Sequence, residues 1–224
     1  MLEILANSLP QLAEGLKTTI GLTVLSLILG TILGIFLAVI RIYGKFPLPY
    51  LIIFYERVFR GIPLIVIFFL FYFGLSLQIG LNIDPFTAAI FGLGLRGAAY
   101  QAQIFRSAIN SIPEGQMVAA RSLGMSKLSA IRNIILPQML RLSVPGWSNE
   151  FTIVLKDTSI AFSIGVIELM RQGRYIYVNN PDYVLPVFLF IALIYFIMVI
   201  SANKTLSYLE KKYKMSGFEI GVER

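Results

Sequence analysis

The chain has 224 residues, 57% of them hydrophobic, and a formal net charge of +7. Soluble domains are only about 45–50% apolar, so this composition excludes an ordinary water-soluble enzyme and favours a helix bundle in lipid. The sequence contains no cysteine and no histidine, which excludes disulfides, thiolate chemistry and histidine-based zinc or acid–base sites.

The N-terminal segment leads into the first apolar run. It carries Glu3 and Glu14 rather than a basic cluster, and the run that follows, residues 18–40, is too long for a signal peptide, so we expect no cleavage. Residues 61–80 and 183–203 are two further runs without charge. Each of the three runs matches the roughly 20 residues that cross a bilayer core of about 30 Å.

Residues 85–105 and 142–167 are also apolar but contain charged side chains, and the positions of Lys and Arg decide whether they cross the membrane. If all five runs cross, one side of the membrane holds fourteen of the nineteen Lys and Arg residues, in segments 41–60, 106–141 and 204–224. The prediction is therefore an all-α integral membrane protein with five transmembrane helices in a single domain, residues 1–224. Its N-terminus lies outside and its C-terminus in the cytoplasm.

The longest polar interval, residues 113–137, separates the third and fourth spans. Pro113 suits the first turn of a helix, and Gly124 is predicted to break that helix in the left-handed conformation that glycine tolerates. Ser126 is placed to cap a second short helix, which Pro137 is predicted to end. The pattern predicts a helix–glycine–helix unit at the cytoplasmic side. Taken alone, it is also consistent with a connector that lies on lipid headgroups.

This polar segment resembles the EAA loop of permease subunits in ATP-binding-cassette (ABC) importers, which reads Glu-Ala-Ala, three residues, Gly, nine residues, Ile-x-Leu-Pro. Val118 departs from the Glu of that pattern, whereas the Gly-to-Pro spacing is kept. The stretches "FRGIPLIVIFFLFYFGL", "AAYQAQIFRSAINSIPEGQMVAARSLGMS" and "LKDTSIAFSIGVIEL" resemble the polar amino-acid uptake branch, and the resemblance covers most of residues 15–210. By this resemblance, the residues that couple to an ATPase are Ala119, Ala120, Arg121, Gly124, Met125, Ser126, Leu136 and Pro137.

The resemblance implies the transmembrane subunit of an ATP-driven amino-acid importer, multi-pass in the cytoplasmic membrane of a prokaryote. The chain contains no GxxxxGK[ST] phosphate loop, so a separate ATPase subunit is expected to use ATP and Mg, and this chain is expected to be no enzyme and to bind no cofactor or metal. The other implied partners are a second copy or a related permease, membrane lipid, the amino-acid ligand and an extracytoplasmic substrate-binding protein docked on residues 168–183. No nucleic acid is expected.

Charges inside the spans are candidates for the ligand pathway, since a charge near the bilayer centre costs at least about 2.5–3.5 kcal/mol. Helical spacing places candidates on one stripe of the third span and on one stripe of the fourth. The candidate ligand-binding residues are Arg60, Asp84, Arg96, Tyr100, Gln103, Trp147, Glu150 and Asp157.

An amino-acid ligand always brings a carboxylate, which suits Arg96 or Arg60. Glu150, supported by Asp157 or Asp84, suits a cationic side chain, best a guanidinium because two parallel hydrogen bonds form. The two aromatic rings of the set offer cation–π contacts. The hypothesis is an importer of basic amino acids: arginine, lysine or histidine.

Two other interpretations stay open. If Arg96 and Lys156 neutralise the acids internally, a neutral ligand such as glutamine fits better. An intramembrane hydrolase would use Lys156 with Ser159 or Ser163, which lie at helical spacing, although the sequence shows no loop for an oxyanion hole. A purely structural membrane subunit predicts no charges within the spans, and this chain has four.

Overall fold

The computed structural model describes residues 2–75, 78 and 80–213. These residues are helical with no strand among them, as expected for a chain whose backbone polar groups must be satisfied in lipid. The elements are α1 (Leu2–Tyr43), α2 (Leu48–Gly61), α3 (Leu64–Phe69), the π-helical turn η1 (Leu70–Gly74), α5 (Pro85–Asn110), α6 (Glu114–Ser122), α7 (Lys127–Ala130), the π-helical turn η2 (Ile131–Ile135), α8 (Leu136–Asp157), the 3-10 helix η3 (Thr158–Ile164), α9 (Leu169–Asn179), the 3-10 turn η4 (Pro181–Tyr183) and α10 (Val184–Tyr213).

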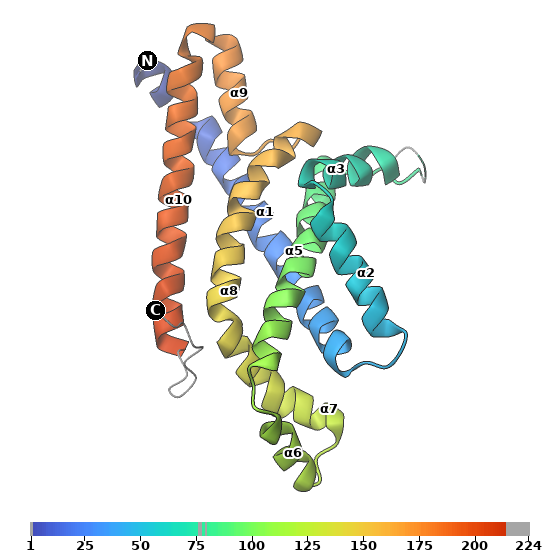
Figure 1. Ribbon diagram of the computed structural model, residues 1–224. Helices are drawn as coiled ribbons and strands as arrows, with labels where there is room; N and C mark the ends of the chain where they lie inside the picture. Colours follow the sequence, from blue (N-terminus) through green and yellow to red (C-terminus); the bar gives the residue numbers. More distant parts are fainter. Residues whose placement is uncertain (1, 76–77, 79, 214–224) are drawn as a thin grey trace.

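Helix α1 crosses the molecule diagonally, and α5 packs along it (Figure 1). Helices α8 and α10 lie to one side of this pair and α2 to the other. The N-terminus and α9 lie at one end of the molecule, whereas α6 and α7 form the opposite end, toward which α10 runs. Long helices therefore connect two ends that are built from short ones.

Two helices among the described residues are long and apolar enough to cross a membrane, Asn7–Tyr43 and Pro181–Lys212. They contain the predicted spans 18–40 and 183–203. The predicted third span, 85–105, lies within α5, and the fourth, 142–167, corresponds to α8 and η3. The α-helix of this fourth segment ends at Asp157, and the 3-10 helix η3 follows it.

The predicted second span is divided. Helix α2 ends at Gly61, Ile62 is extended with φ −91° and ψ 132°, and α3 begins after Pro63. The helix predicted over 61–80 therefore begins at Leu64 rather than at Gly61, because a proline lacks the N–H that would continue the ladder and pushes the preceding residue into extended geometry. Residues 76, 77 and 79 of the predicted span lie outside the described residues.

Small residues bring α1 and α5 into close contact. A Cβ on Gly30 would lie 2.6 Å from Nε2 of Gln101, and one on Gly34 would lie 3.0 Å from the Cβ of the same residue. Gly30 and Gly34 form the GxxxG spacing that membrane helices use for close approach, and here it packs α1 against another helix of the same chain.

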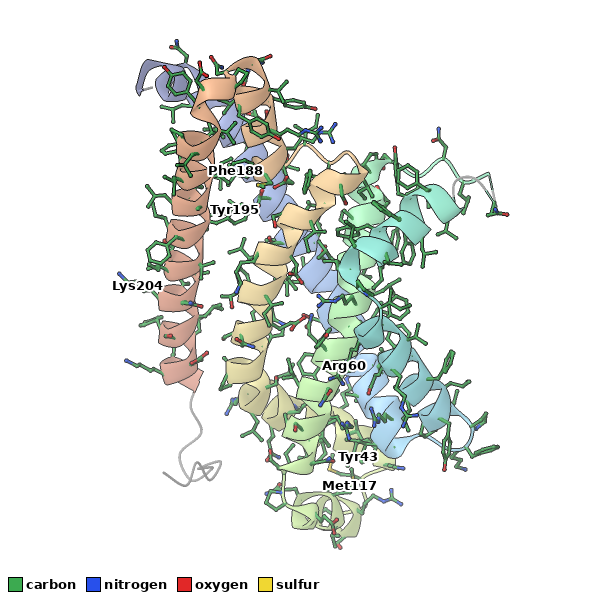
Figure 2. The ribbon with its side chains drawn as sticks, turned by 45° about the horizontal axis from the view of Figure 1, so that its top comes forward. Tyr43, Arg60, Met117, Phe188, Tyr195 and Lys204 are labelled. Atoms are coloured by element: carbon green, nitrogen blue, oxygen red, sulfur yellow. The ribbon has the colours of Figure 1, made fainter. Side chains whose placement is uncertain are left out.

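The polar segment, residues 113–137, begins with α6 after Pro113. Gly124 has φ +81°, which confirms the left-handed break, and the hydroxyl oxygen of Ser126 accepts a hydrogen bond from the N–H of Ser129 at 3.1 Å, which confirms the cap of α7. Met117, which Figure 2 places near Tyr43 at this end of the molecule, packs against the adjoining apolar core. Apolar side chains on the outer face are strongly exposed: Val118, Leu123 and Leu128.

The prediction that Pro137 ends the second short helix was wrong. The chain continues from α7 through the π-helical turn η2 directly into α8, and Pro137 lies in the first turn of α8. Proline itself has no N–H that needs a partner in the first turn, and it follows a wider turn in which the N–H of Leu136 bonds to the carbonyl of Ile131. The polar segment is thus joined to α8 without a loop.

Candidate functional site

A groove of about 750 Å³ lies between α5 and α8 and is bordered by the end of α2. Its size is within the roughly 300–1,000 Å³ of small-molecule sites. Four of the predicted ligand residues line it: Arg60, Tyr100, Gln103 and Glu150. The polar lining also includes Ser107, Ser111, Ser143 and Asn149, which the sequence analysis did not select.

The stripe predicted on α5 is present. The ring of Tyr100 lies between two guanidinium groups, with centroid distances of 5.1 Å to Arg60 and 4.9 Å to Arg96. Arg60, at the end of α2 (Figure 2), donates a hydrogen bond to Oε1 of Gln103. Tyr100 therefore stabilises both cations from one ring, and Arg60 is held at the edge of the groove.

Arg96 is paired inside the protein. Its Nη1 lies 2.7 Å from Oδ2 of Asp157, and the two side chains are 20% and 23% exposed. This pair joins α5 to the end of α8 and balances both charges. It leaves Glu150 as the carboxylate of the groove without a direct partner among the described residues.

Glu150 is 3% exposed, and its Oε1 is buried without a hydrogen-bond partner in the described part of the chain. Helix α8 places it directly after Asn149 and one turn before Ile153 on the groove wall. A buried carboxylate without a partner is costly, so it marks a position where a complementary donor or cation is expected to bind.

Two predicted site residues lie elsewhere. Trp147 faces α1, where its indole N–H donates to the hydroxyl of Thr31 at 2.9 Å. Asp84 caps the N-terminus of α5, accepting from the N–H of Thr87 at 3.1 Å, and hydrogen bonds from Thr87 lower the pKa of this exposed carboxyl. The expected supporting role of Asp84 beside Glu150 is replaced by a capping role, because the tight turn before α5 puts it beyond the end of the groove.

The geometry gives no support to a hydrolase. The hydroxyl of Ser159 donates to the backbone carbonyl of Lys156 at 2.7 Å, so it is engaged by the backbone of η3. A nucleophilic serine needs its hydroxyl directed at a base, which this contact prevents.

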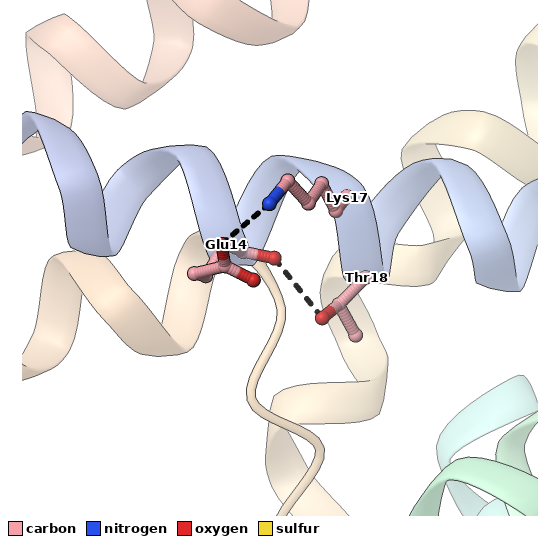
Figure 3. A network of polar contacts seen from close by, with 3 residues as sticks. All are labelled: Glu14, Lys17 and Thr18. Carbon is pink, nitrogen blue, oxygen red and sulfur yellow. Dashed lines mark hydrogen bonds and ion pairs between the residues drawn. The ribbon is translucent and has the colours of Figure 1, made fainter.

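Glu168 fixes the end of the molecule that carries the N-terminus and α9. Its carboxylate caps α9, accepting from the N–H of Met170 at 2.7 Å and of Arg171 at 2.8 Å, and it accepts from the hydroxyl of Tyr195 on α10 at 3.0 Å (Figure 2). The fully buried Glu168 thus ties α9 to α10. By contrast, Glu14 and Lys17 on α1 form an exposed local pair at 2.5 Å (Figure 3), of a kind that contributes little to stability.

The family described as "binding-protein-dependent transport system inner membrane component" matches residues 30–215. The chain belongs to this family. It is therefore a membrane component of an ABC amino-acid transporter and not an enzyme itself, because ATP hydrolysis belongs to the ATPase subunit of such systems.

Curated relatives are amino-acid permeases. The probable amino-acid permease protein YxeN of Bacillus subtilis (strain 168) is 39% identical over 201 residues, which cover 88% of this chain and 89% of that protein. The glutamine transport system permease protein GlnP of Escherichia coli (strain K12) is 35% identical, with 93% and 95% covered. The L-cystine transport system permease protein TcyB of Bacillus subtilis (strain 168) is 37% identical, with 84% and 80% covered.

Solved structures share the fold of this permease. A crystal structure of an amino acid ABC transporter with histidines contains a chain that is 36% identical, with a TM-score of 0.83 and 93% and 96% of the two chains covered. A chain of the MetNI methionine ABC transporter in an inward-facing conformation has a TM-score of 0.80 at 20% identity, with 92% and 98% covered, a likeness of fold alone.

Proposed function

We propose that this permease forms the pathway of an ATP-driven importer of basic amino acids and that the groove between α5 and α8 binds the ligand. The observation that carries the proposal is that Glu150, buried and without a partner in the described chain, lines the same groove as the exposed cation Arg60. A zwitterion with a cationic side chain complements both charges.

The ligand carboxylate binds Arg60, whose guanidinium lies beside Gln103 at the edge of the groove. The ligand side chain binds Glu150, with Asn149 and the serine hydroxyls of the groove available for its remaining hydrogen bonds. Arg96 and Asp157 contribute as a balanced pair, holding the ring of Tyr100 rather than binding the ligand. Hydrogen bonds between ionised groups are the strong ones, which favours arginine, lysine or histidine. The solved amino acid ABC transporter with histidines is consistent with such a ligand.

A neutral polar amino acid is the second candidate, because relatives of comparable identity are named for glutamine and for L-cystine. In that case Glu150 accepts hydrogen bonds from an amide or an amino group and no charge is neutralised. The uncompensated charge of Glu150 is the reason we place the basic amino acids first.

The membrane arrangement in this proposal has five spans, with the N-terminus outside and the C-terminus in the cytoplasm. The end formed by α6 and α7 lies in the cytoplasm, and its exposed Val118, Leu123 and Leu128 contact a separate ATPase subunit that uses ATP and Mg. The continuous path from α7 through η2 into α8 gives a stiff connection from that subunit to the helix that carries Glu150.

The assembly in this proposal contains two permease chains, identical or related, because the groove opens at the surface of one chain. An extracytoplasmic substrate-binding protein docks at the opposite end, on α9 and the turn that follows, where Arg171 and Tyr175 are held together at 3.1 Å. Interfaces favour arginine and tyrosine side chains.

The test is Glu150→Gln in the permease purified with its ATPase subunit and measured by equilibrium binding of arginine and of citrulline, the neutral isostere. Loss of a charge-assisted contact worth about 1.5–3 kcal/mol weakens arginine binding by roughly 10- to 100-fold and leaves citrulline nearly unchanged. Glu14→Gln, which removes an exposed carboxylate that pairs locally, is the control and leaves both affinities unchanged. Equal loss for arginine and citrulline contradicts the assignment of Glu150 to the ligand side chain, and preference for glutamine in the unaltered protein supports the second candidate.

A further inference from the structure

Helix α5 carries a second polar cluster, which faces α1 rather than the groove. Gln101 is fully buried, and its Oε1 accepts a hydrogen bond from the hydroxyl of Thr31 on α1 at 2.7 Å. The same hydroxyl accepts the indole N–H of Trp147 on α8 at 2.9 Å. Three helices thus meet in one chain of hydrogen bonds, from Trp147 through Thr31 to Gln101.

Donor and acceptor chemistry gives this series of hydrogen bonds a direction. An indole N–H can only donate, so the oxygen of Thr31 must accept from Trp147, and the single hydroxyl proton of Thr31 is then donated onward. The atom of Gln101 that faces Thr31 is its carbonyl oxygen, which accepts this proton. The amide nitrogen Nε2 lies beside Gly30 of α1, where a Cβ would be 2.6 Å from it, and is not bonded to the hydroxyl of Thr31.

Nε2 of Gln101 and Oε1 of Glu150 are both buried and without a hydrogen-bond partner among residues that the structure describes. A Cβ built on Gly97 would lie 3.5 Å from the nitrogen and 3.9 Å from the oxygen, so both atoms border the same methyl-sized space beside this glycine. One atom is a donor and the other an acceptor, and each needs the kind of partner that a water molecule supplies.

We propose that Gln101 is a positioning residue for the ligand-binding carboxylate: its Nε2 donates to one water molecule held beside Gly97, and that water donates to Oε1 of Glu150. Trp147 and Thr31 fix the polarity of the relay. The inference rests on the proposed function in one respect, that Glu150 binds the ligand side chain.

The relay explains how a buried carboxylate is held ready for a ligand. The water donates to Oε1 of Glu150 and fixes the rotamer of this side chain before the ligand arrives. Less side-chain freedom is therefore lost when the ligand binds. It also links the ligand site to α1, the longest helix of the molecule, through side chains of three helices.

The functional test compares two variants at one position on α1. Thr31→Val keeps the shape of the side chain but removes the hydroxyl, whereas Thr31→Ser keeps the hydroxyl. In the permease purified with its ATPase subunit, Thr31→Val is expected to weaken arginine binding by about tenfold relative to citrulline, the cost of one hydrogen bond to a charged group. Thr31→Ser is expected to keep the ratio of arginine affinity to citrulline affinity of the unaltered protein. A merely structural role of Thr31 changes both affinities together and overturns the proposal.

A second variant tests the water itself. Gly97→Ala adds a methyl group whose contacts of 3.5 and 3.9 Å are ordinary, so the fold accepts it while the space for water is filled. The expected result is the same selective loss for arginine as with Thr31→Val. Ser26→Ala, which removes another buried hydroxyl of α1 without a partner in the described chain, is the matched control and leaves the ratio unchanged. An unchanged ratio in Gly97→Ala overturns the bridging water.

A measurement without ligand separates this inference from the proposed function. A density map of the ligand-free complex, at a resolution that shows ordered water, is expected to contain one water molecule within hydrogen-bond distance of Gln101 Nε2 and Glu150 Oε1, and the map of Gly97→Ala is expected to lack it. If the unaltered protein shows no preference for arginine over citrulline but the water is present, the proposed function fails and the relay stands. If arginine is preferred and no water is present, the relay fails alone.

Discussion

Two regions of the molecule differ in how far apart in the sequence their bonded residues lie. One is the polar segment of α6 and α7, and the other is the groove between α5 and α8. In the polar segment, Ser126 bonds to Ser129 and Arg121 to Met125, partners three and four residues apart. In the groove, Arg60 meets Gln103 across 43 positions, and beside it Arg96 meets Asp157 across 61. The turns of the first region are determined locally, although Lys127 also donates to the backbone carbonyl of Tyr43 on α1 at 3.0 Å; the second region exists only when distant helices pack. Variants in the polar segment are therefore expected to alter the connection between α6 and α7 alone. Variants in the groove are expected to alter how separate helices pack against one another.

The largest expected effect is at Gly124. Gly124→Val places a β-branched residue at φ +81°, where L-residues are strained, although the space around the position is open. We expect α6 and α7 to lose their fixed angle, so that amino-acid uptake in membrane vesicles falls to the background level while ATP hydrolysis by the complex continues.

Gly115→Val is the matched control, because Gly115 also has open space but no positive φ. It is expected to retain most uptake. Uptake at the unaltered rate in Gly124→Val would show that the fixed angle between α6 and α7 is not needed for coupling to the ATPase subunit. The polar segment would then be a passive connector.

The next effect in size is at the pair of Arg96 and Asp157. Asp157→Asn or Arg96→Gln alone leaves a partly buried charge without its partner, which is expected to cost about 2 kcal/mol, at the low end for such pairs because each side chain is about one-fifth exposed. The melting temperature of the purified permease is expected to fall in each single variant.

The double variant tests whether the charges of Arg96 and Asp157 are coupled. Replacing both residues removes both charges, so the loss is expected to be smaller than the sum of the two single losses, and a double-mutant cycle measures the coupling. Additive losses would mean that Arg96 acts independently of Asp157 and is free to bind the ligand carboxylate.

The smallest expected effect is at Ser126. Ser126→Ala removes the cap of α7 and is expected to cost about 1 kcal/mol, confined to the polar segment. Amide hydrogen exchange of residues 127–130 is expected to accelerate, while exchange in α5 stays the same; Ser126→Asp, which keeps a capping oxygen, restores protection. Faster exchange in α5 would contradict the view that the polar segment is locally determined.

Local chemistry explains which features were predictable. The left-handed Gly124, the cap at Ser126 and the stripe of Arg96, Tyr100 and Gln103 follow from residues a few positions apart, and all three are present. The second span was predicted to begin at Gly61 rather than at Leu64, because proline suits the first turn of a helix as well as the residue before it.

The residues of the groove were harder to assign, since a polar side chain in a span can face a ligand or a neighbouring helix. Trp147 and Gln101 illustrate the two errors. Trp147 was predicted to face the ligand and bonds to Thr31 on α1, and Gln101 was overlooked although it is the fully buried partner of the same hydroxyl. The glycines Gly30 and Gly34 beside Thr31 were the available sign that α1 packs closely there.

By itself the sequence determined the class of protein, the long apolar helices and the joint at Gly124, because hydropathy, charge distribution and backbone preference act within one helix or turn. Only the tertiary structure decided that Arg96 is neutralised by Asp157 and that Glu150 is not. Pairing of charges depends on which faces of α5 and α8 meet, and helical spacing gives the stripe on each helix but not the rotation of one helix against another.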